Sequence, residues 1–519
     1  MRDAVQWSRF ALWLRFALAE HARTWLGALL IIACAGCSSP KAPPTSLPEM
    51  PTAFKEADPR WVAVVPADAQ PRGEWWKAFG DPVLSEILVG ASDASTGIQA
   101  AAARLAKARS LVRTADANRK PQASLAAGLD RIGGPLINAA GGSGLLYTLA
   151  AGVSYEADLF GRLAGEVNAA SLDAESHEAL LQSTRLAVHA DIAQAYFELR
   201  MLDIERRVVR ETLQAHRQAL HLTQRRFELG SVAELDVARM QTDVAATEAE
   251  GLVLDRRRVQ LEHAIALLAG KVASTFRIAE LYDIGALPRI PPGLPSTLLA
   301  RRPDIAAAQR TVLAAQARLG VAQTAWLPNV NLNASQGFAA SDLGGLLAMS
   351  ARAYGIGALL ALPLFDGGRR EAAIEGARAD LELEASNYRE RILVALREVE
   401  DQLSSLRVLA DHERVQSVAA SSATRAREIA RSRYEGGLGS QLDLLDAQRT
   451  ELRHQRQVVQ VRSLQFQATV GLVRALGGGW EALPKEISRA KDATIGAAYA
   501  DPVRTSDHDG QILHPTPHV

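Results

Sequence analysis

Long helical patterns dominate the chain. From Arg162 to about Leu229, apolar residues recur every three or four positions, which predicts a coiled-coil helix about 100 Å long. Three polar residues interrupt its apolar seam, namely Arg206, His216 and Thr223. A matching pattern begins near Arg369 and ends near Tyr434. Shorter helices are predicted over residues 83–119, 233–269, 297–326 and 440–476.

Other segments alternate between apolar and polar or small residues with a period of two, which predicts β-strands. These segments form two hairpins, and they cover residues of about 122–131, 145–157, 328–338 and 352–365. Such alternation is typical of a transmembrane barrel. Four strands are too few to close a barrel, and unpaired strand edges cannot lie in lipid. Several copies of the chain must therefore share one barrel.

The chain contains two copies of one long unit. Gly230 and Gly437 lie 207 positions apart, and the same offset takes Asp236 to Asp443. It also takes Pro121 to Pro328, so it holds over a long stretch of sequence. A constant offset of this kind indicates an internal two-fold repeat.

Each copy contains the signature of a helical hairpin tip. A helix ends at Gly230 or Gly437, where a left-handed residue is easily accommodated. A short turn follows, and Asp236 or Asp443 then lies at the start of the return helix, close to the positive end of its dipole. These carboxylates either only mark the start of the return helices or, in an oligomer, form a ring of acidic groups around an opening.

Composition narrows the possible functions. Lys and Arg total 58 and Asp and Glu also total 58, so no excess of charge points to nucleic acid. Outside the N-terminal region no stretch of 18 apolar residues predicts an ordinary spanning helix. We find no nucleophile with a base and an orienting group, no phosphate loop and no cluster with metal-ligand spacing. The chain is therefore expected not to be an enzyme and to need no cofactor.

The two cysteines lie at the end of an N-terminal apolar run. Arginines precede the run, and small residues flank Cys37, as in a bacterial lipoprotein signal. We expect Cys37 to carry the covalent lipid, with Cys34 as the alternative. The long basic segment also leaves a start downstream of Met1 open. The expected organisation is a signal peptide (1–36), a tether and equatorial segment (37–82), the first repeat (83–270), a linker (271–296), the second repeat (297–476) and a tail (477–519).

Several motifs together resemble the TolC/OprM-type outer-membrane efflux channels, in their lipoprotein (OprM/NodT-like) branch. The resemblance covers about residues 74 to 478, and its motifs are Trp75–Pro82, Pro291–Ser296, Arg301–Ile305, Pro363–Gly368 and Leu444–Arg449. It implies an α+β membrane protein, a homotrimer with a helical tunnel in the periplasm and a barrel in the outer membrane. It also implies docking on a periplasmic adaptor and an inner-membrane pump, usually of the RND type.

The same resemblance implies a gate at the periplasmic tips. Tyr434 matches the gate tyrosine of the family, Asp236 an acidic tip position, and Asp443 and Asp446 a carboxylate ring. Gly439 stands where TolC has a gate arginine, so a TolC-like salt-bridge lock is not expected there. The sequence thus favours a passive efflux conduit. A lipid-anchored coiled-coil scaffold without a pore is the alternative, and it leaves the four alternating strands unexplained.

Overall fold

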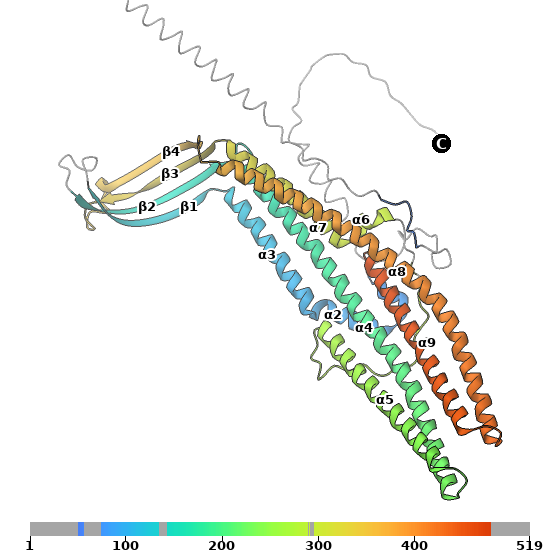
Figure 1. The fold of residues 1–519 in the computed structure, drawn as a ribbon. Helices are drawn as coiled ribbons and strands as arrows, with labels where there is room; N and C mark the ends of the chain where they lie inside the picture. Colours follow the sequence, from blue (N-terminus) through green and yellow to red (C-terminus); the bar gives the residue numbers. More distant parts are fainter. Residues whose placement is uncertain (1–49, 57–73, 134–142, 289, 291–294, 479–519) are drawn as a thin grey trace, which may run out of the picture.

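The computed structural model describes residues 50–56, 74–133, 143–288, 290 and 295–478. A four-stranded sheet lies at one end of a long helical body, and two helical hairpins end side by side at the other (Figure 1). Cys34, Cys37, the signal peptide and nearly all of the C-terminal tail lie outside the described residues. Among the described helices, none combines the length and the apolar character needed to cross a membrane.

The first copy consists of two shorter helices, a strand hairpin and a long helical hairpin. The long helix α4 has 67 residues and the return helix α5 has 35, so the rod is about 100 Å long and its partner half that length. The elements are α2 (Pro82–Ala94), α3 (Thr96–Asn118), β1 (Gln122–Gly133), β2 (Ser143–Ala157), α4 (Arg162–Glu228) and α5 (Glu234–Leu268).

The second copy repeats these elements at the sequence offset. Its long helix and return helix again have 67 and 35 residues. Its elements are α6 (Leu298–Arg301), α7 (Pro303–Gln323), β3 (Asn329–Ala340), β4 (Arg352–Ala361), α8 (Arg369–Glu435) and α9 (Gln441–Ala475). Single 3-10 turns occur at Trp75–Phe79, Pro295–Thr297, Thr324–Trp326 and Met349–Ala351. The expected internal two-fold repeat is therefore present in the backbone.

Two expected helices are broken, and the prediction of continuous helices was wrong. The helix expected over 83–119 is interrupted at Ser95, which has extended backbone angles. The one expected over 297–326 is interrupted at Arg302, because the residue before a proline disfavours helical angles. Each break receives the end of a return helix: a side chain at Gly270 would overlap the backbone of Ala94, and one at Gly477 that of Arg301.

The sheet order is β1-β2-β3-β4, with every neighbouring pair antiparallel. The register places Leu149 between Ala127 and Phe338, on the apolar face. The opposite face carries small or polar residues, such as the row formed by Ser124, Gly152, Ser335 and Gly355. The period-two prediction is thus confirmed across all four strands. Only the last strand is shorter than expected: β4 ends at Ala361, before Pro363, which has no N–H to donate to a ladder.

The largest core lies where both copies and the N-terminal segment meet. The rings of Phe79, Phe197 and Phe466 stack there, with centroids 4.7 and 6.2 Å apart. The Asp81 carboxylate caps α2 as its sequence predicts, accepting from Val83 and Leu84 N–H at 2.9 and 3.0 Å. Its other oxygen accepts a hydrogen bond of 2.6 Å from the hydroxyl of Tyr196. This core fixes the first turn of α2 against the middle of α4.

Candidate gate at the helical tips

Both hairpin tips close with the same backbone motif. Gly230 and Gly437 each have φ 71°, in the left-handed region. The N–H of Ser231 donates to the carbonyl of Arg226 at 2.8 Å, and the N–H of Leu438 donates to that of Arg433 at 2.8 Å. These are Schellman closures, so the expected role of the two glycines as tip turns follows from their conformation.

The two return helices begin differently. In the second copy Ser440 and Asp443 form a capping box: the Ser440 hydroxyl accepts from Asp443 N–H at 3.1 Å, and the Asp443 carboxylate accepts from Ser440 N–H at 3.2 Å. The first copy has Ala233 at the capping position, which has no side-chain acceptor. Its Asp236 lies 3.8 Å from Arg239 on the same helix. Helix capping therefore explains part of the role of Asp443. Asp443 and Asp446 are both exposed to solvent.

A direct contact joins the tips of the two long helices. The guanidinium of Arg226 on α4 donates to the hydroxyl of Tyr434 on α8 at 2.9 Å, and its central carbon lies 5.2 Å from the centre of the ring. Gly439 is packed against the end of α8, where an added Cβ would lie 3.2 Å from Arg433. The arginine that meets Tyr434 therefore comes from the first hairpin. Arg226 is the repeat partner of Arg433, 207 positions away, and nothing in the sequence alone points to its contact with Tyr434.

Further polar contacts tie α9 to the first hairpin above the tips. The Arg449 guanidinium contacts Asp243 on α5, with its Nε 3.0 Å from Oδ1. Two helical turns further along α9, Arg456 contacts Glu205 on α4 at 2.8 Å and Glu250 on α5 at 2.9 Å. The spacing of seven residues between the two arginines matches that between Asp243 and Glu250, so both pairs lie along one helical seam.

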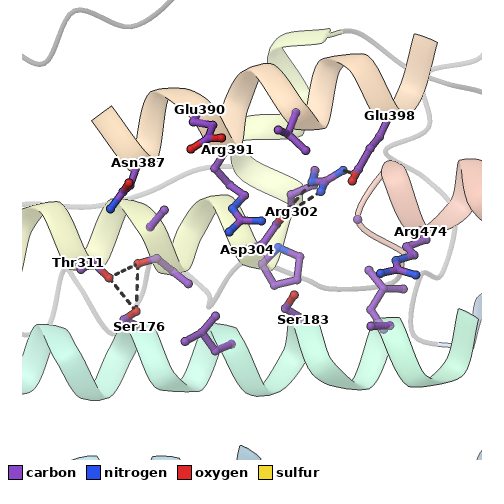
Figure 2. Close-up of a pocket in the computed structure, with 18 of the residues that line it drawn as sticks. Ser176, Ser183, Arg302, Asp304, Thr311, Asn387, Glu390, Arg391, Glu398 and Arg474 are labelled. Atoms are coloured by element: carbon purple, nitrogen blue, oxygen red, sulfur yellow. Dashed lines mark hydrogen bonds and ion pairs between the residues drawn. The ribbon is translucent and has the colours of Figure 1, made fainter. Parts of the chain in front are cut away.

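A polar cavity of about 640 Å³ lies between α4, α7 and α8 (Figure 2). The Ser176 hydroxyl contacts the Thr311 hydroxyl and the Ala307 carbonyl, both at 3.1 Å. The guanidinium of Arg302 binds Asp304 and Glu398, and these neighbours raise its pKa against the effect of burial. Among the described residues that line the cavity, the Ser176 hydroxyl contacts Thr311 and Ala307 and no carboxylate or histidine. This arrangement has no catalytic constellation.

The tips also present apolar side chains to solvent. Leu229 is 81% exposed and Leu438 78% exposed, beside their closing glycines. Leu235 and Leu442, which are repeat partners at the start of the return helices, are also exposed. Exposed apolar residues gathered at one end of a protein mark an interaction surface.

The fold and the tips define a channel of the outer membrane efflux class. The outer membrane efflux protein family matches residues 90–271 and 294–478, and the chain belongs to this family. It is 31% identical over 474 residues to the pyoverdine export outer membrane protein OpmQ of Pseudomonas aeruginosa, covering 89% of this chain and 98% of that protein. It is 29% identical to the toluene efflux pump outer membrane protein TtgC of Pseudomonas putida, covering 86% of this chain and 93% of that protein.

Solved structures have the same architecture. The outer-membrane channel OprN superimposes with a TM-score of 0.76 at 28% identity, over 84% of this chain and 99% of OprN. VceC of Vibrio cholerae superimposes with a TM-score of 0.73 at 30% identity, over 79% of this chain and all of VceC. The expected fold class, a helical tunnel joined to a barrel, is confirmed. The expected outer-membrane location is also confirmed, and the relatives are channels rather than enzymes.

Proposed function

We propose that three copies of this chain form the outer-membrane conduit of a tripartite efflux system. The observation that carries the proposal is the sheet, with its apolar face, its face of small and polar residues, and its two outer strands β1 and β4. In lipid an open edge strand would leave a row of N–H and C=O groups without partners. Pairing β4 of one copy with β1 of the next removes every edge, and three copies supply twelve strands.

The conduit is passive. Its relatives of nearly equal identity are named for pyoverdine and for toluene, so one architecture serves dissimilar cargo. A conduit of this kind needs a partner that selects and drives the cargo. The exposed leucines at the closed tips offer an apolar docking surface for a periplasmic adaptor, which in turn joins an inner-membrane pump of the RND type.

The N-terminal segment supports a lipid anchor at Cys37, with Cys34 as the alternative. Phe54 is buried against a cluster that contains Leu298 and Val399, and Met50 packs near Tyr388. The segment thus runs along α8, with its earlier residues nearer the sheet. From Cys37 to Met50 an extended chain spans about 43 Å, whereas α8 from Tyr388 back to its start is about 29 Å long. A lipid at either cysteine can therefore reach the membrane surface.

The test is the protein mass of the complex extracted from membranes, measured by light scattering with the detergent contribution subtracted. A trimer that requires detergent supports the shared barrel and the conduit. A monomer or dimer that needs no detergent contradicts the shared barrel and favours the alternative, a lipid-anchored coiled-coil scaffold without a pore. Mass spectrometry of the N-terminal peptide tests the lipid separately, by locating the modified cysteine.

A further inference from the structure

His216 occupies an unusual place in the seam between the two hairpins. It lies on α4, its side chain is only 2% exposed, and its Nδ1 lies 3.2 Å from the Thr247 hydroxyl on α5. The hydroxyl proton of Thr247 is already donated to the Asp243 carbonyl at 2.8 Å. The Thr247 oxygen must therefore accept a hydrogen bond from Nδ1–H, which assigns the neutral tautomer with a bare Nε2.

The other ring nitrogen is buried without a partner. Nε2 of His216 has no hydrogen-bond partner among the described residues, and the same holds for Oδ2 of Asp243, which is 4% exposed. The other oxygen of Asp243 is bound by Arg449 from α9, whose side chain is 53% exposed. Asp243 precedes Thr247 on α5 by one helical turn, so its buried carboxylate lies on the same side of α5 as the Thr247–His216 contact, and a guanidinium of the other hairpin binds it.

The second copy has no equivalent of this arrangement. The residue 207 positions after His216 is Ala423, and the residue 207 positions after Asp243 is Thr450. The repeated backbone does not require either group, because the second copy builds the same helices without them. A buried ring nitrogen without a hydrogen-bond partner lowers stability, and a function for it would offset that cost.

We propose that His216 is a proton-operated release for the contact between α9 and the first hairpin, an inference that rests on the gated conduit proposed above. A proton taken up at Nε2 creates a second cation that competes with Arg449 for the Asp243 carboxylate. Asp243 on α5 then pairs with the protonated His216 on α4, and Arg449 moves into solvent. The second hairpin loses one of its contacts with the first, while those of Arg456 and Tyr434 remain, and the tips open more often as the periplasmic side becomes acidic.

The electrostatic surroundings give the direction of this response. Burial lowers the pKa of His216 first of all; the Asp243 carboxylate opposes this, and Arg449 adds to it. The neutral ring is therefore favoured while the contact is intact. Acidification below the ordinary histidine pKa of about 6.5 favours any state in which the ring is solvated. Each unit by which the pKa differs between the closed and open states shifts their ratio by up to about tenfold.

The experiment records conductance of the full-length protein in planar bilayers while the periplasmic side is taken from about pH 7.5 to about pH 5. The wild-type open probability is expected to rise by about tenfold. His216→Gln should abolish the rise. Arg449→Gln, at a half-exposed position that tolerates substitution, should be as open at neutral pH as the wild type is in acid. His221→Gln, an exposed histidine further along α4, is the matched control and should keep the rise.

The outcomes separate this inference from the conduit itself. An acid response that survives His216→Gln, a wild-type channel without an acid response, or an Arg449→Gln channel that is closed like the wild type each overturns the switch while the conduit stands. A purified trimer that forms no pore at any pH overturns the conduit and the switch with it. Circular dichroism and the mass of the detergent complex check that each variant is folded.

Discussion

Replacing Tyr434 with phenylalanine isolates the contact between the two long helices at their tips. The substitution removes the hydroxyl that accepts from Arg226 at 2.9 Å and leaves the ring that lies under the guanidinium. Hydrogen bonds to charged groups contribute about 1.5–3 kcal/mol when buried. Both side chains here are only partly buried, so solvent screening reduces the value to about 1 kcal/mol.

A trimer contains this contact three times. If the three tips open together, losing the hydroxyl raises the ratio of open to closed channels by the effect of about 3 kcal/mol, which is about a hundredfold. Single-channel recording of the full-length protein measures this ratio directly. Arg226→Gln should give at least as large an increase, because it also removes the cation over the ring, and the double variant should add little to Arg226→Gln alone.

The control is Arg225→Gln. Arg225 is adjacent on the same helix, and its one ion pair among the described residues is with Glu228 of its own last turn, at 3.2 Å. Its loss removes the same charge without touching the second hairpin, so the open probability should stay within about twofold of the wild type. If Tyr434→Phe and Arg225→Gln open the channel equally, the contact between the tips does not hold it closed.

Three further substitutions test other parts of the molecule. Asp443→Asn combined with Asp446→Asn should weaken block of the pore by divalent cations applied from the periplasmic side, and unchanged block in bilayer recordings would refute a carboxylate ring. Gly337→Ala should lower the yield of folded trimer on a gel, because a Cβ there overlaps a main-chain carbonyl of β2; trimer yield equal to the wild type would contradict this. Tyr196→Phe removes the hydrogen bond to Asp81 and should lower stability by about 1 kcal/mol, seen as an unfolding midpoint a few degrees lower; an unchanged midpoint would show that the bond contributes nothing.

The repeat made the backbone predictable from sequence. When the same pattern occurs twice at one offset, each copy confirms the element boundaries read in the other. The sequence therefore predicted the ends of the long helices and the tip glycines to within a residue or two. The break at Ser95 was missed because its only local signs are Ser95 itself and Gly97 two residues later; the end of α5 abuts the chain there. That cause is a tertiary contact between segments far apart in sequence, which local propensity does not contain.

The polar contacts at the tips were less predictable. His216 and Thr223 stood out in the sequence as interruptions of an apolar seam, which signals a polar partner but does not identify it. The partner of Thr223 is Gln441, at 3.3 Å, more than 200 positions away. The sequence predicts no arginine lock at Gly439, and the arginine that contacts Tyr434 is Arg226 on the neighbouring hairpin. Which residues pair across the hairpins depends on how the two hairpins lie side by side. The periodicity of either hairpin alone does not contain this information.

The two copies differ in side chains where the hairpins touch. Their long helices and return helices have equal lengths, so the two hairpins have similar backbones. Their side chains differ at the tips: the position of Tyr434 in the first copy is Phe227, which has no hydroxyl, and the position of Asp243 in the second copy is Thr450, which has no charge. Bonds between hairpins of one chain therefore have no counterpart at the equivalent positions of the other copy. In the proposed conduit the repeated backbone supplies a continuous wall, and the different side chains of the two copies make the contacts between hairpins unequal without altering that backbone.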